Sequence, residues 1–142
     1  MVWQDGSGWI PVTGGNVWYK MIGSRQPGIP LVILHGGPGA PHDYLEPLSV
    51  LADERPVIFY DQLGCGTSDK PDDPALWTVE HFVEELGDVL ASLGQRDVHL
   101  LGQSWGTTLA VEYMLRTKSD RVRSLILSAP FFSATRWIGD QR

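Results

Sequence analysis

The sequence is short of cysteine, of basic residues and of long hydrophobic runs. Its single cysteine, Cys65, excludes a disulfide within the chain and fits a reducing compartment. No apolar run approaches the roughly 18 residues that a membrane-spanning helix needs, and the first residues lack a secretory signal pattern. With 11 Lys and Arg against 17 Asp and Glu, the formal net charge of −6 argues against nucleic acid as the main partner. We therefore expect a cytoplasmic protein that binds neither nucleic acid nor membrane.

Histidine is absent from the whole stretch after Ser104. This serine lies in Gly102-Gln103-Ser104-Trp105-Gly106, the G-x-S-x-G pattern of a nucleophile elbow. A serine hydroxyl needs a histidine base held by a carboxylate, and on the fold that uses this elbow the chain order is serine, acid, histidine. The sequence therefore assigns neither base nor acid in this chain, because all histidines precede Ser104 and no later acid is followed by one. The histidines are His35, His42, His81 and His99, and the later acids are Glu112, Asp120 and Asp140.

Short apolar runs alternate with helical patterns along the chain, which predicts an α/β fold with a mostly parallel sheet. The expected strands are a hairpin of residues 9–12 and 17–22, followed by four runs at 31–34, 57–60, 98–101 and 124–127. The expected helices cover residues 79–93, with Thr78 as N-cap and Gly94 as the stop, then a stretch that begins just after Ser104 and runs through Leu115, and a weaker one at 43–52. The acidic side chains of the first helix are expected on its solvated face: Glu80, Glu84, Glu85 and Asp88.

The surroundings of Ser104 match what an elbow requires. A predicted strand precedes it and a helical pattern follows it, and its flanking positions, Gly102 and Gly106, are small where strand and helix must approach closely. The alternative is a serine in an ordinary strand-to-helix turn.

A glycine-rich segment, His35-Gly36-Gly37-Pro38-Gly39, follows the predicted strand at 31–34. Backbone N–H groups of such a loop can stabilise a developing oxyanion, and the N–H of Trp105 would be the second donor. The segment has neither the GK[ST] nor the G-x-G-x-x-G of a phosphate loop. The alternative is a tight turn without a ligand. His35 is expected to be structural and to bond the backbone of this loop.

A third motif, Asp61-Gln62-Leu63-Gly64-Cys65-Gly66-Thr67-Ser68, follows the strand at 57–60. Asp61 is expected to accept hydrogen bonds from loop N–H groups. Cys65 is either an inert small residue, the favoured reading, or a reactive thiol near the cleft. Asp69, Asp72 and Asp73 are interpreted as a solvated loop, because calcium-loop spacing is absent. We expect neither a metal ion nor a cofactor.

HGGPG, DQLGCGTSD and GQSWGTTLA, in this order, resemble the α/β-hydrolase superfamily, and within it the proline iminopeptidase (prolyl aminopeptidase) family most of all. The resemblance extends over about residues 18–130. It implies a cofactor-free serine hydrolase that releases an N-terminal residue, often proline, from small peptides or amides. It further implies that Ser104 is the nucleophile and that Trp105 and Gly37 donate the oxyanion-hole N–H groups, with Gly36 as the alternative donor.

The resemblance also implies parts that this sequence does not contain. Members of the family are roughly twice as long, and their acid, their histidine and most of a helical cap lie in the later half. We expect residues 1–130 to be the N-terminal half of the core, residues 131–142 to begin the cap, and a second polypeptide to supply the Asp and His. The sheet would then end on an uncovered edge strand near 124–128. The alternatives are a related amino-acid amidase, esterase or lactonase, or an inactive truncated or binding fragment.

Overall fold

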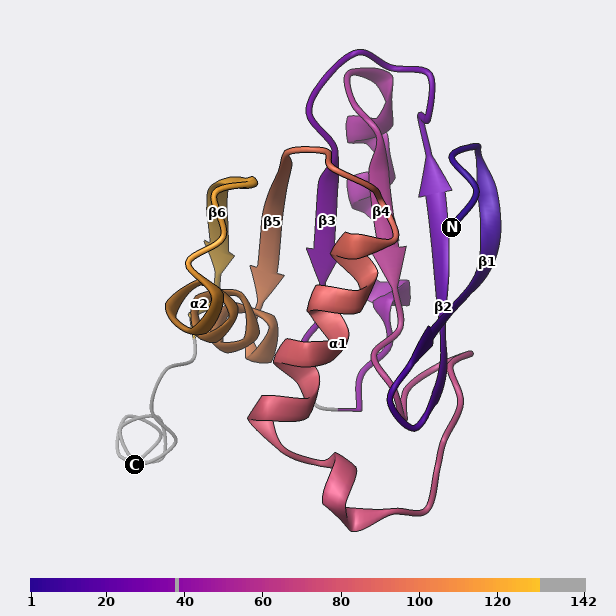
Figure 1. Ribbon diagram of the computed structural model, residues 1–142. Coiled ribbons are helices and arrows are strands. Elements are labelled where there is room, and N and C mark those ends of the chain that lie inside the picture. The colour runs from indigo at the N-terminus through magenta and orange to yellow at the C-terminus, as the bar shows by residue number, and fades with distance from the viewer. Residues whose placement is uncertain (38, 131–142) are drawn as a thin grey trace.

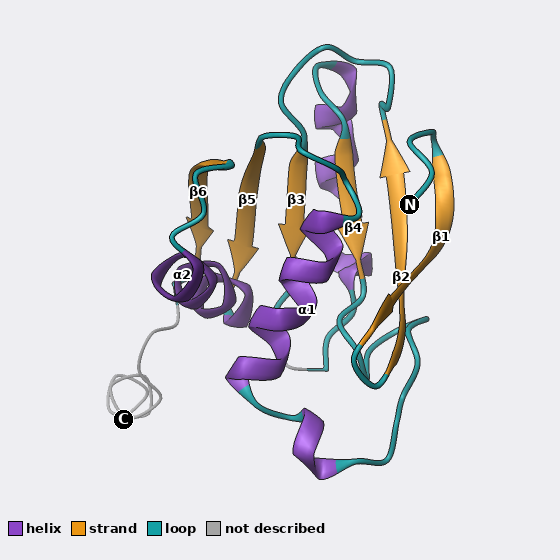
Figure 2. Cartoon of the chain, in the orientation of Figure 1, coloured by secondary structure: helices purple, strands orange, loops and turns teal. Residues whose placement is uncertain are grey.

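In a computed structural model, which describes residues 1–37 and 39–130, the chain folds into a six-stranded sheet with helices on both faces (Figures 1 and 2). The strand order is β1-β2-β4-β3-β5-β6. The strands are β1 (Gly6–Val12), β2 (Gly15–Ile22), β3 (Leu31–Leu34), β4 (Val57–Tyr60), β5 (Val98–Gln103) and β6 (Val122–Ser128). The helices are the 3₁₀ segments η1 (His42–Asp53) and η2 (Pro74–Leu76) and the α-helices α1 (Val79–Ala91) and α2 (Trp105–Thr117).

The sheet is mostly parallel, as predicted. β1 and β2 form an antiparallel hairpin, and β2 pairs antiparallel with β4, whereas β4, β3, β5 and β6 run parallel to one another. Strand β5 is two residues longer than predicted at its carboxyl end, so that it runs directly to Ser104. Since the carboxyl ends of the four parallel strands share one edge, the loops after β3, β4 and β5 meet there.

The two faces of the sheet are covered by different elements. In β3, Val32 and Leu34 pack in the large core under α1 and α2, whereas Leu31 and Ile33 pack in a smaller core with η1. Figure 1 shows α1 and α2 in front of the sheet and η1 behind it. The weak helix predicted at 43–52 is this 3₁₀ segment, which contains Pro47, a residue that has no N–H to bond within a helix.

Helix α1 begins as predicted, but one of its acids does not face solvent. The hydroxyl of Thr78 accepts a hydrogen bond from the N–H of His81 at 3.1 Å, which is an N-cap. Glu80 and Glu84 are exposed, whereas Glu85 is only 1% exposed. The Glu85 carboxylate accepts from the N–H of Leu63 at 3.1 Å and lies 3.2 Å from Nε2 of His81. The prediction of a solvated Glu85 was therefore wrong, because a loop N–H and a histidine give this carboxylate buried partners.

Within the described part of the chain, β6 is the last strand of the sheet and pairs only with β5. Ile126 of this strand is 45% exposed. It pairs with Leu101 and so lies on the same face of the sheet as η1, outside the core that η1 covers. The predicted start of a cap at 131–142 lies outside the described residues. No helix of the described residues combines the length and the apolar character needed to cross a membrane.

Candidate functional site

Ser104 occupies a strained turn between β5 and α2. Its φ of 55° and ψ of −117° lie in a region that residues other than glycine rarely adopt, at a cost of about 1–3 kcal/mol. The Ser104 N–H donates to the carbonyl of Ser128 at 3.0 Å, and its own carbonyl accepts from the N–H of Thr107 at 2.9 Å. The backbone therefore has the strained strand-to-helix geometry expected of an elbow rather than that of an ordinary turn.

The two glycines of the elbow are required by close packing. A Cβ on Gly102 would lie 2.3 Å from the carbonyl oxygen of Gly106, and a Cβ on Gly106 would lie 2.0 Å from the carbonyl oxygen of Leu34. Both neighbours are backbone atoms, which cannot move aside as a flexible side chain would. The elbow is thus seated directly on the carboxyl end of β3, next to the loop that follows it.

The loop after β3, which we call the glycine loop (His35, Gly36, Gly37 and Gly39), lies beside the elbow. The N–H of Gly36 donates to the hydroxyl of Tyr44 at 2.7 Å, so this N–H is already in use. Gly37 has a φ of 118°, which favours glycine. Trp105 is the first residue of α2, so its N–H has no carbonyl partner within the helix. The bond to Tyr44 weighs against Gly36 as an oxyanion donor, and the roles of Gly37 and Trp105 stay predictions.

His35 is fully buried and bonds the backbone of the glycine loop, as predicted. Its Nδ1–H donates to the carbonyl of Gly36 at 2.8 Å, and its Nε2 accepts the N–H of Gln62 at 2.9 Å. Because Nε2 accepts the N–H of Gln62, it carries no proton and the ring is neutral. Burial lowers the pKa of His35, which favours the same neutral form. His35 is thus a structural histidine.

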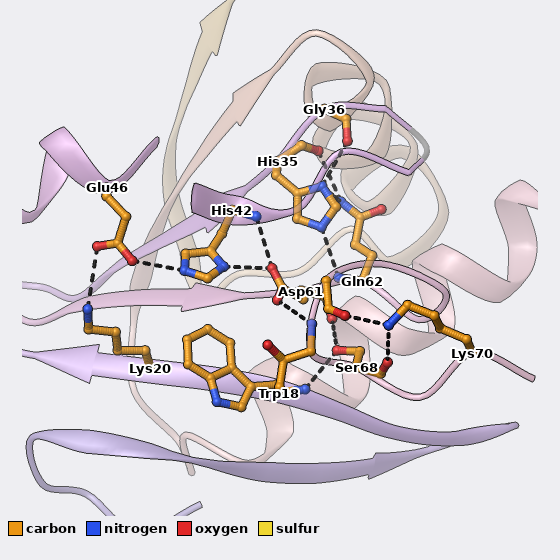
Figure 3. Close-up of polar contacts among 12 residues, drawn as sticks. Trp18, Lys20, His35, Gly36, His42, Glu46, Asp61, Gln62, Ser68 and Lys70 are labelled. Atoms are coloured by element: carbon orange, nitrogen blue, oxygen red, sulfur yellow. Dashed lines mark hydrogen bonds and ion pairs between the residues drawn. The ribbon is translucent and has the colours of Figure 1, made fainter. Parts of the chain in front are cut away.

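Gln62 joins the glycine loop to the elbow, a role that the sequence did not reveal. Its amide nitrogen donates to the carbonyl of His35 at 3.0 Å, and its amide oxygen accepts from Nε1 of Trp105 at 3.0 Å. Figure 3 shows Gln62 beside the ring of His35. The only signal was its place directly after Asp61. The side chain of Gln62 is only 1% exposed and bonds both segments, so it fixes the spacing between the glycine loop and the elbow.

Asp61 and His42 form a second polar cluster, which lies below His35 and Gly36 in the view of Figure 3. One Asp61 oxygen accepts from the backbone N–H of His42 at 2.9 Å and lies 2.7 Å from its Nδ1, and the other accepts from the N–H of Thr67 at 3.1 Å. Asp61 thus binds loop N–H groups, as predicted. The sequence does not identify His42 as its partner, because this contact depends on tertiary structure.

Two carboxylates bracket the His42 ring. Its Nε2 lies 2.9 Å from Glu46, and Glu46 in turn lies 3.4 Å from Nζ of Lys20. Burial alone would lower the pKa of His42, but hydrogen bonds to Asp61 and Glu46 outweigh burial and raise it. For Asp61, burial would raise the pKa, but the hydrogen bonds from His42 and Thr67 lower it. The cluster therefore favours a charged His42 beside an ionised Asp61.

The favoured interpretation of Cys65 in the third motif, an inert small residue, agrees with its burial. Cys65 is 4% exposed, and burial raises the pKa of its thiol, which favours the inert thiol form. Asp69 accepts from the N–H of Asn16 at 2.7 Å, and Asp73 accepts from the N–H of Ala75 at 3.1 Å, so both serve turns. Within residues 1–37 and 39–130, no group of three or more His, Cys, Asp or Glu side chains is placed to hold a metal ion.

The four histidines have partners other than Ser104. Besides His35 and His42, the ring of His81 bonds Glu85, and Nδ1 of His99 lies 2.7 Å from the hydroxyl of Ser124. Their hydrogen bonds place them in the loop scaffold, in α1 and on β5. Ser104, Trp105 and the glycine loop thus lie at one end of the sheet, whereas among the described residues no histidine is hydrogen-bonded to Ser104.

Comparison with known proteins gives a consistent result. The model of the "alpha/beta hydrolase fold" family matches residues 29–142. Proline iminopeptidase from Heyndrickxia coagulans is 50% identical over 95% of this chain and 46% of its own length, and that from Lactobacillus acidophilus is 48% identical over 92% and 45%. The crystal structure of a Mycobacterium smegmatis proline iminopeptidase is similar with a TM-score of 0.76 at 39% identity, covering 84% of this chain and 42% of that one. The chain therefore spans about half the length of the relatives it matches.

Proposed function

Because this chain belongs to the α/β-hydrolase family, we propose that it forms the N-terminal half of a serine hydrolase with proline iminopeptidase activity. The substrate class is small peptides or amides with a free N-terminal residue, proline or another. The reaction releases that residue through an acyl-enzyme on Ser104. The relatives named proline iminopeptidase, at 48–50% identity, support this substrate class.

The observation that carries the proposal is the strained backbone of Ser104. A φ of 55° on a non-glycine residue at a strand-to-helix junction needs a compensating reason, and exposure of a nucleophile is the reason that such elbows share. The N–H groups of Trp105 and Gly37 lie on the two segments that meet at this serine. These are the nucleophile and the oxyanion donors that an acyl-transfer site requires in addition to its base.

In the proposed mechanism, the hydroxyl oxygen of Ser104 attacks the carbonyl carbon of the substrate's first residue. The hydroxyl proton passes to a histidine base, and the carbonyl oxygen becomes an oxyanion held by the N–H groups of Trp105 and Gly37. The C–N bond then breaks, the base returns the proton to the leaving amine, and an ester on Ser104 remains. Water repeats the sequence and releases the amino acid.

The base and its acid belong, in this proposal, to a C-terminal segment that completes the fold, carried by a second polypeptide. Two observations support it: the four histidines of this chain bond elsewhere, and the chain spans about half the length of its relatives. Loss of a whole triad costs about 10⁶ in rate, so this chain alone should be nearly inactive. Intact mass and a denaturing gel of the native material would detect the second polypeptide. We also propose a cytoplasmic location, because a single cysteine fits a reducing compartment.

The test is a panel of aminoacyl nitroanilides with the active assembly, meaning this chain together with the segment that completes it. Ser104→Ala should abolish turnover, with a fall of up to about 10⁶. Ser92→Ala, at the C-terminal end of α1 and the opposite end of the sheet, is the matched control and should leave turnover unchanged. Unchanged activity in Ser104→Ala would reject the proposal.

The same panel separates the alternatives. A preference for esters, lactones or amides without a free α-amine would favour a related amidase, esterase or lactonase. If a fluorophosphonate probe does not label Ser104 in the native assembly, the chain is instead an inactive or binding fragment.

A further inference from the structure

Tyr44, a residue of η1, places its hydroxyl between the glycine loop and the elbow. The hydroxyl accepts the N–H of Gly36 at 2.7 Å and donates to the side-chain oxygen of Gln103 at 2.6 Å. Gln103 directly precedes Ser104. One phenol oxygen thus joins two segments that are far apart in the sequence and that carry the proposed oxyanion donors.

The direction of these hydrogen bonds is determined by chemistry. A tyrosine hydroxyl has one proton, and the Gln103 oxygen can only accept, so the proton goes to Gln103 and the lone pairs face Gly36. A Cβ on Gly36 would lie 3.0 Å from both the Tyr44 hydroxyl and the Gln103 amide oxygen, so the contact depends on glycine at this position. The three groups form one packed polar unit.

We propose that Tyr44 is a positioning residue that holds the glycine loop against the elbow, so that the N–H of Gly37 rather than that of Gly36 faces the oxyanion. This inference rests on the proposed function. Because Tyr44 uses the Gly36 N–H, this donor is withdrawn from the site. Because Tyr44 also binds Gln103, it partly sets the spacing between the N–H groups of Gly37 and Trp105, although it bonds neither of them.

The buried Gln62 contact and the Tyr44 contact differ in accessibility. Gln62 is 1% exposed, whereas Tyr44 is 45% exposed, so the ring of Tyr44 can lose its hydroxyl without leaving a buried cavity. Tyr44→Phe is therefore a change that should preserve the fold and remove only the two hydrogen bonds.

The experiment compares Tyr44→Phe with the unmodified active assembly. A misplaced oxyanion donor should lower kcat roughly ten- to a hundredfold, with KM changed less than about twofold, since the oxyanion exists only in the transition state. The affinity of an aminoacyl boronate, whose adduct mimics that state, should fall by the same factor as kcat/KM. Tyr113→Phe, the same chemical change in the second half of α2, should leave kcat unaltered.

A second variant tests the link to the elbow. Gln103→Leu should lower kcat in the same way, and the double variant with Tyr44→Phe should be no slower than the slower single variant, because both remove the same unit. Fully multiplicative losses would overturn the inference, as would a kcat for Tyr44→Phe within twofold of the unmodified assembly.

A measurement without turnover separates this inference from the proposed function. In a Ser104→Ala background, the NMR amide proton of Gly36 should shift upfield when Tyr44→Phe is added, because its acceptor is lost. If Ser104→Ala abolishes turnover while Tyr44→Phe alters neither kcat nor this resonance, the Tyr44 role fails and the hydrolase stands. If Ser104→Ala leaves turnover intact, the proposed function fails first, and the catalytic role of Tyr44 with it.

Discussion

The elbow and the glycine loop meet at the same end of the sheet but are held there by different means. The elbow is held by backbone packing, since Gly102 and Gly106 lie against main-chain atoms of α2 and β3. The glycine loop is held by side chains from two other segments, η1 and the loop after β4. These are Tyr44, Gln62 and Asp61, the last acting through His42. One region is rigid by steric contact, and the other is rigid by hydrogen bonding.

The two kinds of support differ in which substitutions they tolerate. Steric contact with backbone atoms gives an all-or-none requirement, because a backbone cannot repack around one added carbon. Hydrogen bonds can be removed one at a time, each at a modest cost, and some respond to pH. Substitutions in the elbow should therefore be more damaging than substitutions around the glycine loop.

The largest effect is expected for Gly106→Ala. The added Cβ would lie 2.0 Å from the carbonyl oxygen of Leu34, so α2 must move away from β3. We expect the free energy of unfolding to fall by about 3 kcal/mol, the upper end of overpacking costs. Denaturant unfolding measures it. The matched control is Gly87→Ala in α1, where the nearest atom is 3.9 Å away and alanine should stabilise by up to about 1 kcal/mol. Equal stability of the two variants would contradict steric control of the elbow.

A smaller effect is expected for Trp105→Phe, which breaks the contact between the two regions. The change removes the indole N–H and leaves the amide oxygen of the buried Gln62 without its donor. An unsatisfied buried acceptor costs about 1–3 kcal/mol. Trp77→Phe, at a side chain that is 44% exposed, is the control and should change the unfolding free energy by less than about 0.5 kcal/mol. The hypothesis is wrong if Trp105→Phe is as harmless as the control.

The third prediction concerns the pH dependence of the glycine-loop scaffold. The pKa of His42 is raised in the folded protein, so its charged form adds stability that is fully present below about pH 6.5 and is lost as the pH rises through the folded-state pKa. His42→Gln should therefore be most destabilising at acidic pH, and the difference from the unmodified protein should shrink as the pH increases.

Unfolding in urea at several values between about pH 5 and pH 9 would test this prediction. His35 acts in the opposite direction, because burial lowers its pKa and makes the folded state less stable as the pH falls below about 6.5. Since both proteins keep His35, their difference isolates His42. Asp61 stays ionised over this range because its pKa is lowered. A difference that is independent of pH would show that His42 is not charged in the fold.

The smallest effect is expected for Lys20→Gln. Its ion pair with Glu46 spans 3.4 Å between side chains that are each 37% exposed, and exposed pairs contribute about 0–1 kcal/mol. The loss should shrink further in high salt. A loss above about 1 kcal/mol would indicate that the cluster acts as one network from β2 to β4.

The sequence predicted the elbow and the parallel sheet well, and the reason is local. Buried strands such as β3 and β4 are continuous apolar runs, and the elbow's glycines stand beside the serine that needs them. Contacts of this kind are encoded within a few residues of one another. The antiparallel hairpin of β1 and β2 could be predicted for the same reason, because its turn lies between the two strands that it connects.

The loop scaffold could not be predicted, since its partners are distant in sequence. Nothing near Gln62 indicates that Trp105 will be its donor, and nothing near Tyr44 indicates Gly36 as its partner. Glu85 shows the same limit: helical periodicity assigned it to the solvated face, yet Leu63 and His81 meet it in the interior. Buried polar groups are matched by tertiary structure, which a local pattern does not contain.

One backbone hydrogen bond links the elbow to the edge strand of the sheet. The N–H of Ser104 donates to the carbonyl of Ser128, the last residue of β6, the strand at the sheet's edge. Fraying or mispairing of that strand would release the main chain of the serine itself. The turn at Ser104 therefore has its full backbone support only when β6 is paired with β5 in the correct register.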